Sequence, residues 1–287
     1  MTTPRVFIIR HGETEWSLNG RHTGTSDIPL TANGEKRIRA TGRALVGDGR
    51  LIIPKNLAHI YVSPRKRAQR TVELLGLGCG PGVIPWQAHG ELAETNRGEK
   101  GAEGDEDGKV VEGVEAGPAR GTRALVEVTE AVREWDYGDY EGVTSQEIQK
   151  RREKEGLGPW DIWRDGCPGG ESPTQITARL DPLIASLRAR FHRHAIGQPK
   201  GSVHEPYDVL VVAHGHILRA FAGRWVGKEI AENPSLILEA GGVGTLSYEH
   251  HALDEPAILL GGAFMSDLVE GVEGEKGEEE EGGRARS

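Results

Sequence analysis

The sequence is poor in cysteine, with Cys79 and Cys167 alone among 287 residues. Two cysteines cannot build the disulfide framework of a small secreted domain, and neither stands at a spacing typical of metal ligands. We therefore expect reduced thiols, no bound metal and no cofactor.

Long hydrophobic runs are also absent. Apolar residues make up 36% of the chain, and no run approaches the ~18 residues that a membrane helix needs. The segment Met1–Arg5 before the first apolar run is too short for a signal peptide. These features predict a soluble protein without membrane contact, located in the cytoplasm, with the nucleus as an alternative.

The chain has no excess of basic residues. Its net charge is −9. Residues 94–122 contribute −4 and residues 267–287 contribute −5, so the rest of the chain is neutral overall. A nucleic-acid-binding protein is expected to have a basic face, so this class is disfavoured. Both acidic segments lack hydrophobic periodicity, which is typical of disorder. We predict a single domain over residues 1–266, with a disordered insertion at about 94–122 and a disordered tail at 267–287. Oligomeric state and the role of these segments stay open.

Two short apolar runs stand out, because each one ends in a histidine. Val6–Ile9 is followed by Arg10-His11-Gly12, and residues 209–213 are followed by His214-Gly215-His216. Each run reads as a buried strand. In open α/β sheets, ligands bind outside the carboxyl ends of the strands. The two histidines are therefore candidates for one site.

A third predicted strand, at residues 58–62, leads into Ser63-Pro64-Arg65. Serine and proline are typical of a helix N-cap and first helical residue, which predicts Arg65 in the first turn of a helix that ends at Gly76. Backbone N–H groups in a first turn favour anions. The neighbouring Lys66, Arg67 and Arg70 are predicted to be solvated charges.

Other segments have recognisable helix starts or strand patterns. Thr31 is predicted to cap a helix, Thr144 and Glu147 form a capping box, and Ser172 caps the longest helix. The polar segment from Glu13 to Gly24 is predicted to be a loop, and residues 125–128, 245–248 and 257–260 to be strands. Three further histidines are predicted to be solvated: His192, His194 and His204.

Taken together, these motifs resemble the histidine phosphatase superfamily, whose fold is that of phosphoglycerate mutase. The resemblance rests on Arg10-His11-Gly12, on Ser63-Pro64-Arg65, on the acidic and aromatic segment 134–142 and on His214-Gly215-His216, and it spans about residues 5–75 and 130–262. It implies a three-layer αβα fold with a mostly parallel central sheet.

The resemblance also implies catalytic roles. His11 would attack phosphorus and form a phosphohistidine, while Arg10 and Arg65 would hold the phosphoryl oxygens. His214 would donate a hydrogen bond to the same oxygens. Glu134 would protonate the leaving oxygen and then activate water. Two arginines and a histidine supply the positive charge, so no metal is required.

Further residues would bind the substrate. Among members of the family, the motifs look closest to the fungal sedoheptulose-1,7-bisphosphatase branch, which has serine at the position of Ser17. This implies a phosphatase that removes the C1 phosphate of a sugar bisphosphate, with Arg70 and His216 as candidates for the second phosphate. The implied substrate-binding residues are Ser17, Thr23, Gly24, Tyr137, Gly215 and His216.

Three alternatives stay open. The same residues could serve a phosphoglycerate mutase or a broad-specificity phosphatase of the family. A non-catalytic binding module is disfavoured because the full set of implied catalytic residues is present.

Overall fold

The computed structural model describes residues 1–78, 86–88, 121–232 and 235–260. Most of the predicted insertion, the whole of the predicted tail and Cys79 lie outside these residues. Cys167 is a buried free thiol, and burial raises its pKa to about 12, so the thiol stays protonated.

The described strands form one seven-stranded sheet in the order β3-β4-β2-β5-β1-β6-β7. The neighbours from β3 to β1 pair in parallel, whereas β6 and β7 are antiparallel. The predicted α/β fold with a mostly parallel sheet is confirmed. The strands are Val6–Arg10 (β1), Leu57–Val62 (β2), Trp86–Ala88 (β3), Leu125–Val128 (β4), Asp208–Ala213 (β5), Val243–Tyr248 (β6) and Pro256–Leu259 (β7).

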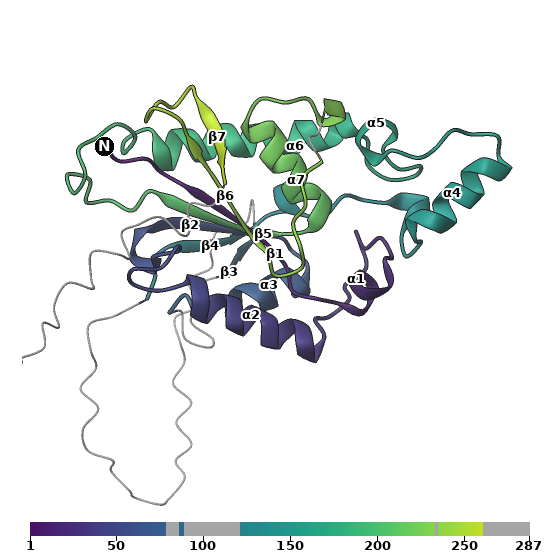
Figure 1. Cartoon of the computed structure of the whole chain (residues 1–287), viewed down its shortest axis with the longest axis horizontal. Coiled ribbons are helices and arrows are strands. Elements are labelled where there is room, and N and C mark those ends of the chain that lie inside the picture. The colour runs from purple at the N-terminus through teal and green to yellow at the C-terminus, as the bar shows by residue number, and fades with distance from the viewer. Residues whose placement is uncertain (79–85, 89–120, 233–234, 261–287) are drawn as a thin grey trace, which may run out of the picture.

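Helices cover both faces of the sheet. In Figure 1, α2 and α3 lie below the sheet, α6 and α7 lie above it, and α1 and α4 extend to the right. The helices are Glu15–Asn19 (α1), Ala32–Leu45 (α2), Lys66–Leu74 (α3), Ser145–Lys154 (α4), Ile162–Asp165 (α5), Pro173–Leu187 (α6) and Gly215–Trp225 (α7). Short 3₁₀ turns span Pro54–Asn56, Glu130–Val132, Gly138–Tyr140 and Ile230–Glu232, and a π-turn spans Arg188–His192.

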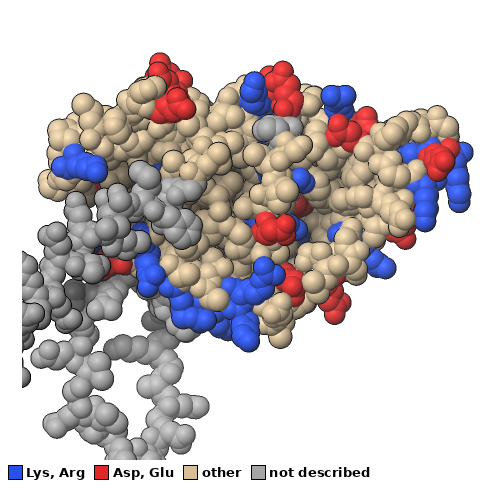
Figure 2. All heavy atoms as spheres, viewed as in Figure 1, with Lys and Arg blue, Asp and Glu red and all other residues tan. Residues whose placement is uncertain are grey.

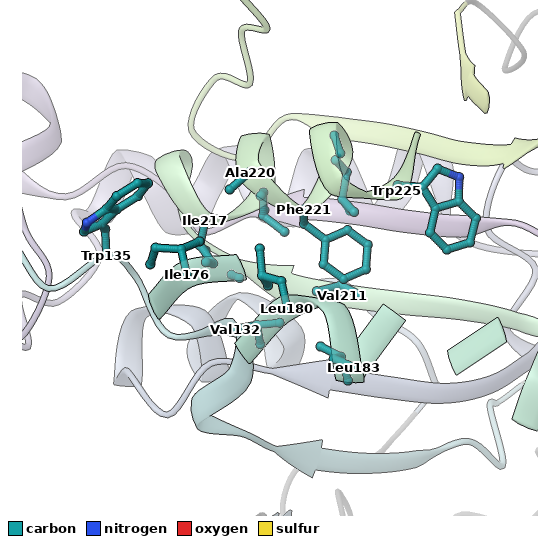
Figure 3. Packing of buried hydrophobic residues seen from close by; sticks show 14 of the residues in the cluster. Val132, Trp135, Ile176, Leu180, Leu183, Val211, Ile217, Ala220, Phe221 and Trp225 are labelled. Atoms are coloured by element: carbon teal, nitrogen blue, oxygen red, sulfur yellow. The ribbon is translucent and has the colours of Figure 1, made fainter. Parts of the chain in front are cut away.

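The side chains of the central strands alternate between two hydrophobic cores. Val6 and Ile8 pack with α6 and α7, whereas Phe7 and Ile9 pack with α2 and α3. Figure 3 shows the first of these cores, where Leu180 and Phe221 lie over Val211. Because both faces are covered, the runs Val6–Ile9 in β1 and 209–213 in β5 are apolar without a break instead of alternating with polar residues.

The parallel register brings three strand ends to one edge of the sheet. Arg10 lies opposite Ala213, and Val62 lies opposite Val212. The next residue of each strand therefore emerges at the same edge, and these residues are His11, His214 and Ser63. This arrangement explains how histidines about two hundred residues apart come together.

Most predicted helix starts are confirmed, and two details are wrong. Thr31, Thr144 and Ser172 each cap a helix as predicted. Helix α3, however, begins at Lys66, so Arg65 is its N-cap and lies before the first turn. The segment after His11 is also not all loop, because it contains α1, which Thr14 caps.

His192 is fully buried, so the prediction that it is solvated is wrong. Its Nδ1 lies 2.7 Å from the hydroxyl oxygen of Tyr248, and its ring packs edge-on against Trp225. Burial, with the charge of Arg188, lowers its pKa to about 3. His192 lies in the π-turn that follows α6, and this turn directs its side chain toward the core. The spacing of apolar residues along α6 did not indicate this orientation.

Replacing His192 with glutamine is expected to reduce the sensitivity of the fold to acid. The unfolded chain takes up a proton on this histidine below about pH 6.5, whereas the folded protein resists protonation until about pH 3. The wild type should therefore lose about 2 kcal/mol of unfolding free energy at this residue between pH 7 and 5. Denaturant unfolding of both proteins at the two pH values measures the difference, and equal losses would contradict it.

Charges on the described surface are of both signs. Figure 2 shows lysine and arginine side chains gathered over α2, which carries Lys36, Arg37, Arg39 and Arg43. Glu35 on the same helix pairs with Arg39 and with Arg70 of α3. Of the helices described, none combines the length and apolar character needed to span a bilayer.

Candidate active site

A cavity of about 250 Å³ opens at the carboxyl edge of the sheet. Segments far apart in the sequence meet around it: the end of β1 with α1, the loop before the 3₁₀ turn Gly138–Tyr140, the start of α7 and the loop before β6. Its lining residues are Arg10, His11, Thr14, Trp16, Ser17, Gly20, Arg21, His22, Thr23, Glu134, Tyr137, Gly215, His216, Arg219, Ile237, Leu238 and Glu239.

The imidazole of His11 is held in one tautomer. Its Nδ1 lies 2.7 Å from the carbonyl oxygen of Gly12, and because a carbonyl only accepts, Nδ1 carries the proton. Nε2 therefore keeps its lone pair. Burial, together with the charges of Arg67 and Arg10, holds the pKa of His11 well below its ordinary value. The ring is thus neutral and has the protonation state of a nucleophile.

His214 lies behind His11 and is fully buried. The two ring centroids are 5.0 Å apart. Its Nδ1 accepts a hydrogen bond from Nε of Arg67 (3.2 Å), which leaves the ring proton on Nε2, 2.6 Å from the Ser63 hydroxyl oxygen. Burial and the charge of Arg67 lower the pKa of His214 well below its ordinary value. The N–H group at Nε2 already donates to the Ser63 hydroxyl oxygen. To donate to a phosphoryl oxygen, it would have to share its proton between the two acceptors or break its hydrogen bond to Ser63.

The arginine that contacts the histidine pair is Arg67, which corrects its prediction as a solvated charge. Its side chain is 1% exposed, and besides His214 it donates to the carbonyl oxygens of Ser26 (2.8 Å) and Thr23 (3.0 Å). Neither Arg65 nor Arg67 is among the residues that line the cavity, and Nε of Arg65 donates to the carbonyl oxygen of Gly24. Because α3 begins at Lys66, Arg67 and not Arg65 points back under the strand ends.

Replacing Arg67 with alanine is expected to lower kcat/KM about 100-fold or more, since it removes a buried cation beside both histidines. Arg67→Lys should recover only part of the loss, because an ammonium cannot reproduce the guanidinium fork. Arg65→Ala is the matched control and should cost less than Arg67→Ala. Phosphate-release kinetics of the three variants, with their unfolding curves, measure this, and a larger loss for Arg65→Ala would restore the original prediction.

Arg10 lines the cavity, and one of its donors has no partner among the described residues. Its Nη1 donates to the carbonyl oxygen of Leu238 (2.9 Å). Its Nε is buried and has no hydrogen-bond partner among the described residues. Such an unpaired buried donor costs free energy.

Glu134 is buried at the N-terminus of α7. Its Oε1 accepts from the backbone N–H groups of Trp135 and Ile217, both at 2.9 Å, and Oε2 accepts from that of His216 at 3.1 Å. Oε2 therefore has only one partner among the described residues. Oε2 is therefore the carboxylate oxygen that can bind a proton and donate it to a ligand in the cavity.

A buried ion network holds the loop that carries Glu134. The Glu171 carboxylate accepts from Arg133, from Arg179 and from the backbone N–H of Asp136. Arg179 also donates to the carbonyl oxygens of Ala131 and Arg133. Such bonds fix the loop backbone on both sides of Glu134, so the position of the carboxylate is set by contacts outside the cavity.

The predicted substrate-binding residues divide into two groups. All of them line the cavity except Gly24. The backbone N–H of Gly24 donates to the Glu141 carboxylate, and a Cβ there would lie 2.3 Å from the carbonyl oxygen of Trp135. Gly24 therefore permits close packing of two loops. Ser17 reaches the cavity, although its hydroxyl bonds to the backbone of Thr14 at the cap of α1.

The cavity residues that sequence reasoning missed include Arg21, His22 and Arg219, which can all donate hydrogen bonds. Arg219 lies one helical turn after Gly215, a spacing that places it on the same side of α7 and that could have indicated it. Arg70, a predicted candidate for a second phosphate, is absent from the cavity because it pairs with Glu35 and Glu73. No grouping of three or more metal-ligating side chains occurs in the described parts of the chain.

The sequence-family model of the histidine phosphatase superfamily (branch 1) matches residues 6–109 and 115–255 of this chain. A sedoheptulose 1,7-bisphosphatase of Saccharomyces cerevisiae is 34% identical over 92% of this chain and 94% of its own length. An acid phosphatase of Mycobacterium tuberculosis is 30% identical over 86% of this chain and 87% of its own. The solved structure of an open reading frame product of M. tuberculosis superposes with a TM-score of 0.59 at 28% identity, covering 90% of this chain and 96% of that one.

The fold, the paired histidines and these relatives define the protein as a phosphoric monoester hydrolase. The chain belongs to the histidine phosphatase superfamily.

Proposed function

We propose that this protein is a metal-independent sugar bisphosphatase that acts through a phosphohistidine at His11. The observation that carries the mechanism is the state of the His11 ring, which is neutral, with its lone pair on Nε2 and a carbonyl on Nδ1. The substrate assignment rests on the second set of donors in the cavity and on the similarity to the yeast bisphosphatase.

In the first step, Nε2 of His11 attacks phosphorus and the bond from phosphorus to the sugar oxygen breaks. Arg10 and Arg67 stabilise the negative charge that develops on the phosphoryl oxygens. Glu134 gives the proton on Oε2 to the departing sugar oxygen, so the products are a phosphohistidine and the free sugar hydroxyl.

In the second step, Glu134 is a carboxylate and takes a proton from water. The resulting hydroxide oxygen attacks phosphorus, and the bond from phosphorus to Nε2 breaks. Inorganic phosphate leaves, His11 returns to its neutral form and Glu134 is protonated again. The Gly12 carbonyl keeps the Nδ1 proton in place through both steps.

The second phosphate of the substrate would bind to Arg219 and Arg21, beside His22. Arg219 packs over Trp163, with its guanidinium carbon 5.0 Å from the ring centroid, and donates to the carbonyl oxygen of Gly215. Its orientation is therefore set before a ligand arrives. The small volume of the cavity suits a metabolite and not a phosphorylated protein.

The direct experiment is phosphate release in the presence of a chelator, on matched substrates. Sedoheptulose 1,7-bisphosphate and fructose 1,6-bisphosphate are compared with their monophosphates and with 3-phosphoglycerate. We expect selective release of the C1 phosphate from a bisphosphate. Isomerisation of phosphoglycerate without release would assign the protein to the mutases, and equal release from every ester would make it a broad-specificity phosphatase.

Arg219→Gln tests the second phosphate site. It should raise KM for a bisphosphate about tenfold or more, because a charge-assisted hydrogen bond is lost, and change KM for a monophosphate much less. Arg224→Gln is the matched control, since Arg224 lies on the same helix and pairs with Asp181 outside the cavity. An equal effect of Arg219→Gln on both substrates would contradict the assignment.

A further inference from the structure

Tyr137 and His216 form a hydrogen-bonded pair at the wall of the cavity, in which Tyr137 is buried and His216 is partly buried. The Tyr137 side chain is 2% exposed, and its hydroxyl oxygen lies 2.7 Å from Nδ1 of His216. The two rings meet edge-on, with centroids 5.7 Å apart. His216 is also linked to the catalytic loop, because its backbone N–H donates to Glu134.

The direction of this hydrogen bond follows from what each group can satisfy. Burial raises the pKa of Tyr137 well above its ordinary value, so the phenol keeps its proton. The hydroxyl has no other partner among the described residues. If it accepted from Nδ1–H, its own proton would be left unpaired in a buried place, which costs free energy. The phenol therefore donates and Nδ1 accepts.

The ring proton of His216 must then lie on Nε2. Burial and the charge of Arg219 lower the pKa of His216 well below its ordinary value, so the ring is neutral and has one N–H. No hydrogen bond within the described residues uses Nε2, and it is not among the buried atoms without a partner. Since His216 lines the cavity, this N–H is available to a ligand.

We propose that Tyr137 is a positioning residue that fixes His216 in the Nε2–H tautomer, so that His216 donates a neutral hydrogen bond to an oxygen of the phosphorylated substrate. This proposal rests on the proposed function. It changes the expected role of Tyr137 from direct contact with the substrate to fixing the tautomer of His216. The rings of His22 and Trp163, with centroids 5.8 and 5.4 Å from that of His216, hold the imidazole in place. A neutral donor adds specificity beside Arg10 and Arg219 without placing another cation between them.

The tautomer is tested directly by ¹⁵N NMR of the histidine rings in the free protein, with the His216 signals identified by their loss in His216→Ala. We expect a protonated Nε2 and a bare Nδ1 in the wild type, and a loss of this preference in Tyr137→Phe. A wild-type ring protonated at Nδ1 would overturn the proposal. This measurement needs no substrate, so its result is independent of whether a sugar bisphosphate is hydrolysed.

Kinetics then separate positioning from direct contact. Tyr137→Phe should raise KM of the best substrate about three- to tenfold, the size expected for one misdirected hydrogen bond, with a smaller change in kcat. In the His216→Ala background, Tyr137→Phe should cause no further rise. Tyr140→Phe is the matched control from the same loop, because Tyr140 is buried outside the cavity. If the effects of Tyr137→Phe and His216→Ala multiply, Tyr137 acts on the substrate itself and the proposal is wrong.

Discussion

Replacing His11 with alanine is expected to reduce kcat by at least about 10⁴-fold, because the group that forms the covalent intermediate is lost. His214 cannot take over, since Arg67 and Ser63 engage both of its ring nitrogens. Arg10 and Arg67 would stay in place, so the variant should still bind phosphate. The expected loss is therefore in turnover and not in affinity.

The measurement combines phosphate release with trapping of the phosphoenzyme. Wild-type protein mixed with labelled substrate and quenched in base should retain label on a histidine, and His11→Ala should retain none. His204→Ala, which removes an exposed histidine, is the matched control and should behave as the wild type. Turnover of His11→Ala within tenfold of wild type would exclude His11 as the nucleophile.

The state of His11 also predicts the pH dependence of the reaction. Its lowered pKa means that, as the pH falls, the ring stays neutral below about 6.5, where an ordinary histidine is already protonated. The acid limb of kcat/KM attributable to this ring should therefore lie below pH 6.5. A limb at or above that value, assigned to His11 by its ring NMR signal, would contradict the burial argument.

The second large effect is expected for Glu134→Gln, with a fall in kcat on the order of 10³-fold for a sugar phosphate. Glutamine can keep the two hydrogen bonds accepted by Oε1, but it carries no proton for the leaving oxygen. It also turns an N–H₂ group toward the backbone N–H of His216, so a small loss of stability is expected. Glu130→Gln, at an exposed residue just before this loop, is the matched control.

The choice of substrate isolates the proton donor. p-Nitrophenyl phosphate has a leaving group that needs no protonation, so Glu134→Gln should still release about one equivalent of p-nitrophenol per enzyme in a burst. The second step would then be slow, because no base activates water, and phosphohistidine should accumulate. Equal losses on both substrates without a burst would show that Glu134 is not the general acid.

Much of the fold could be predicted because local patterns carry it. The apolar runs that became β1 and β5 are covered on both faces, so they contain no polar residue that could confuse them with surface strands. The caps Thr31 and Ser172 are recognisable because a side-chain oxygen must satisfy the first backbone N–H groups of a helix.

The errors have a common cause. A helix that starts one or two residues later than predicted rotates its side chains by about 100° per residue, which was enough to turn Arg67, predicted to be solvated, into the buried space beside His214. His192 lies in a π-turn, where the spacing of the preceding helix no longer holds. Ser17 was expected in a loop, but its hydroxyl takes part in the cap of α1.

The sequence by itself indicated the described strands other than β3, and the placement of His11 and His214 at strand ends, because apolar runs and helix caps are local patterns in the chain. Only the tertiary structure decided that Arg67 lies beneath the histidine pair, that Arg21 and Arg219 face the cavity, and that Tyr137 bonds to His216. Arg67 and His214 are 147 positions apart in the chain, and Tyr137 and His216 are 79 positions apart. The spacing of apolar residues along the sequence does not indicate such contacts. They form when separate elements pack against the same edge of the sheet.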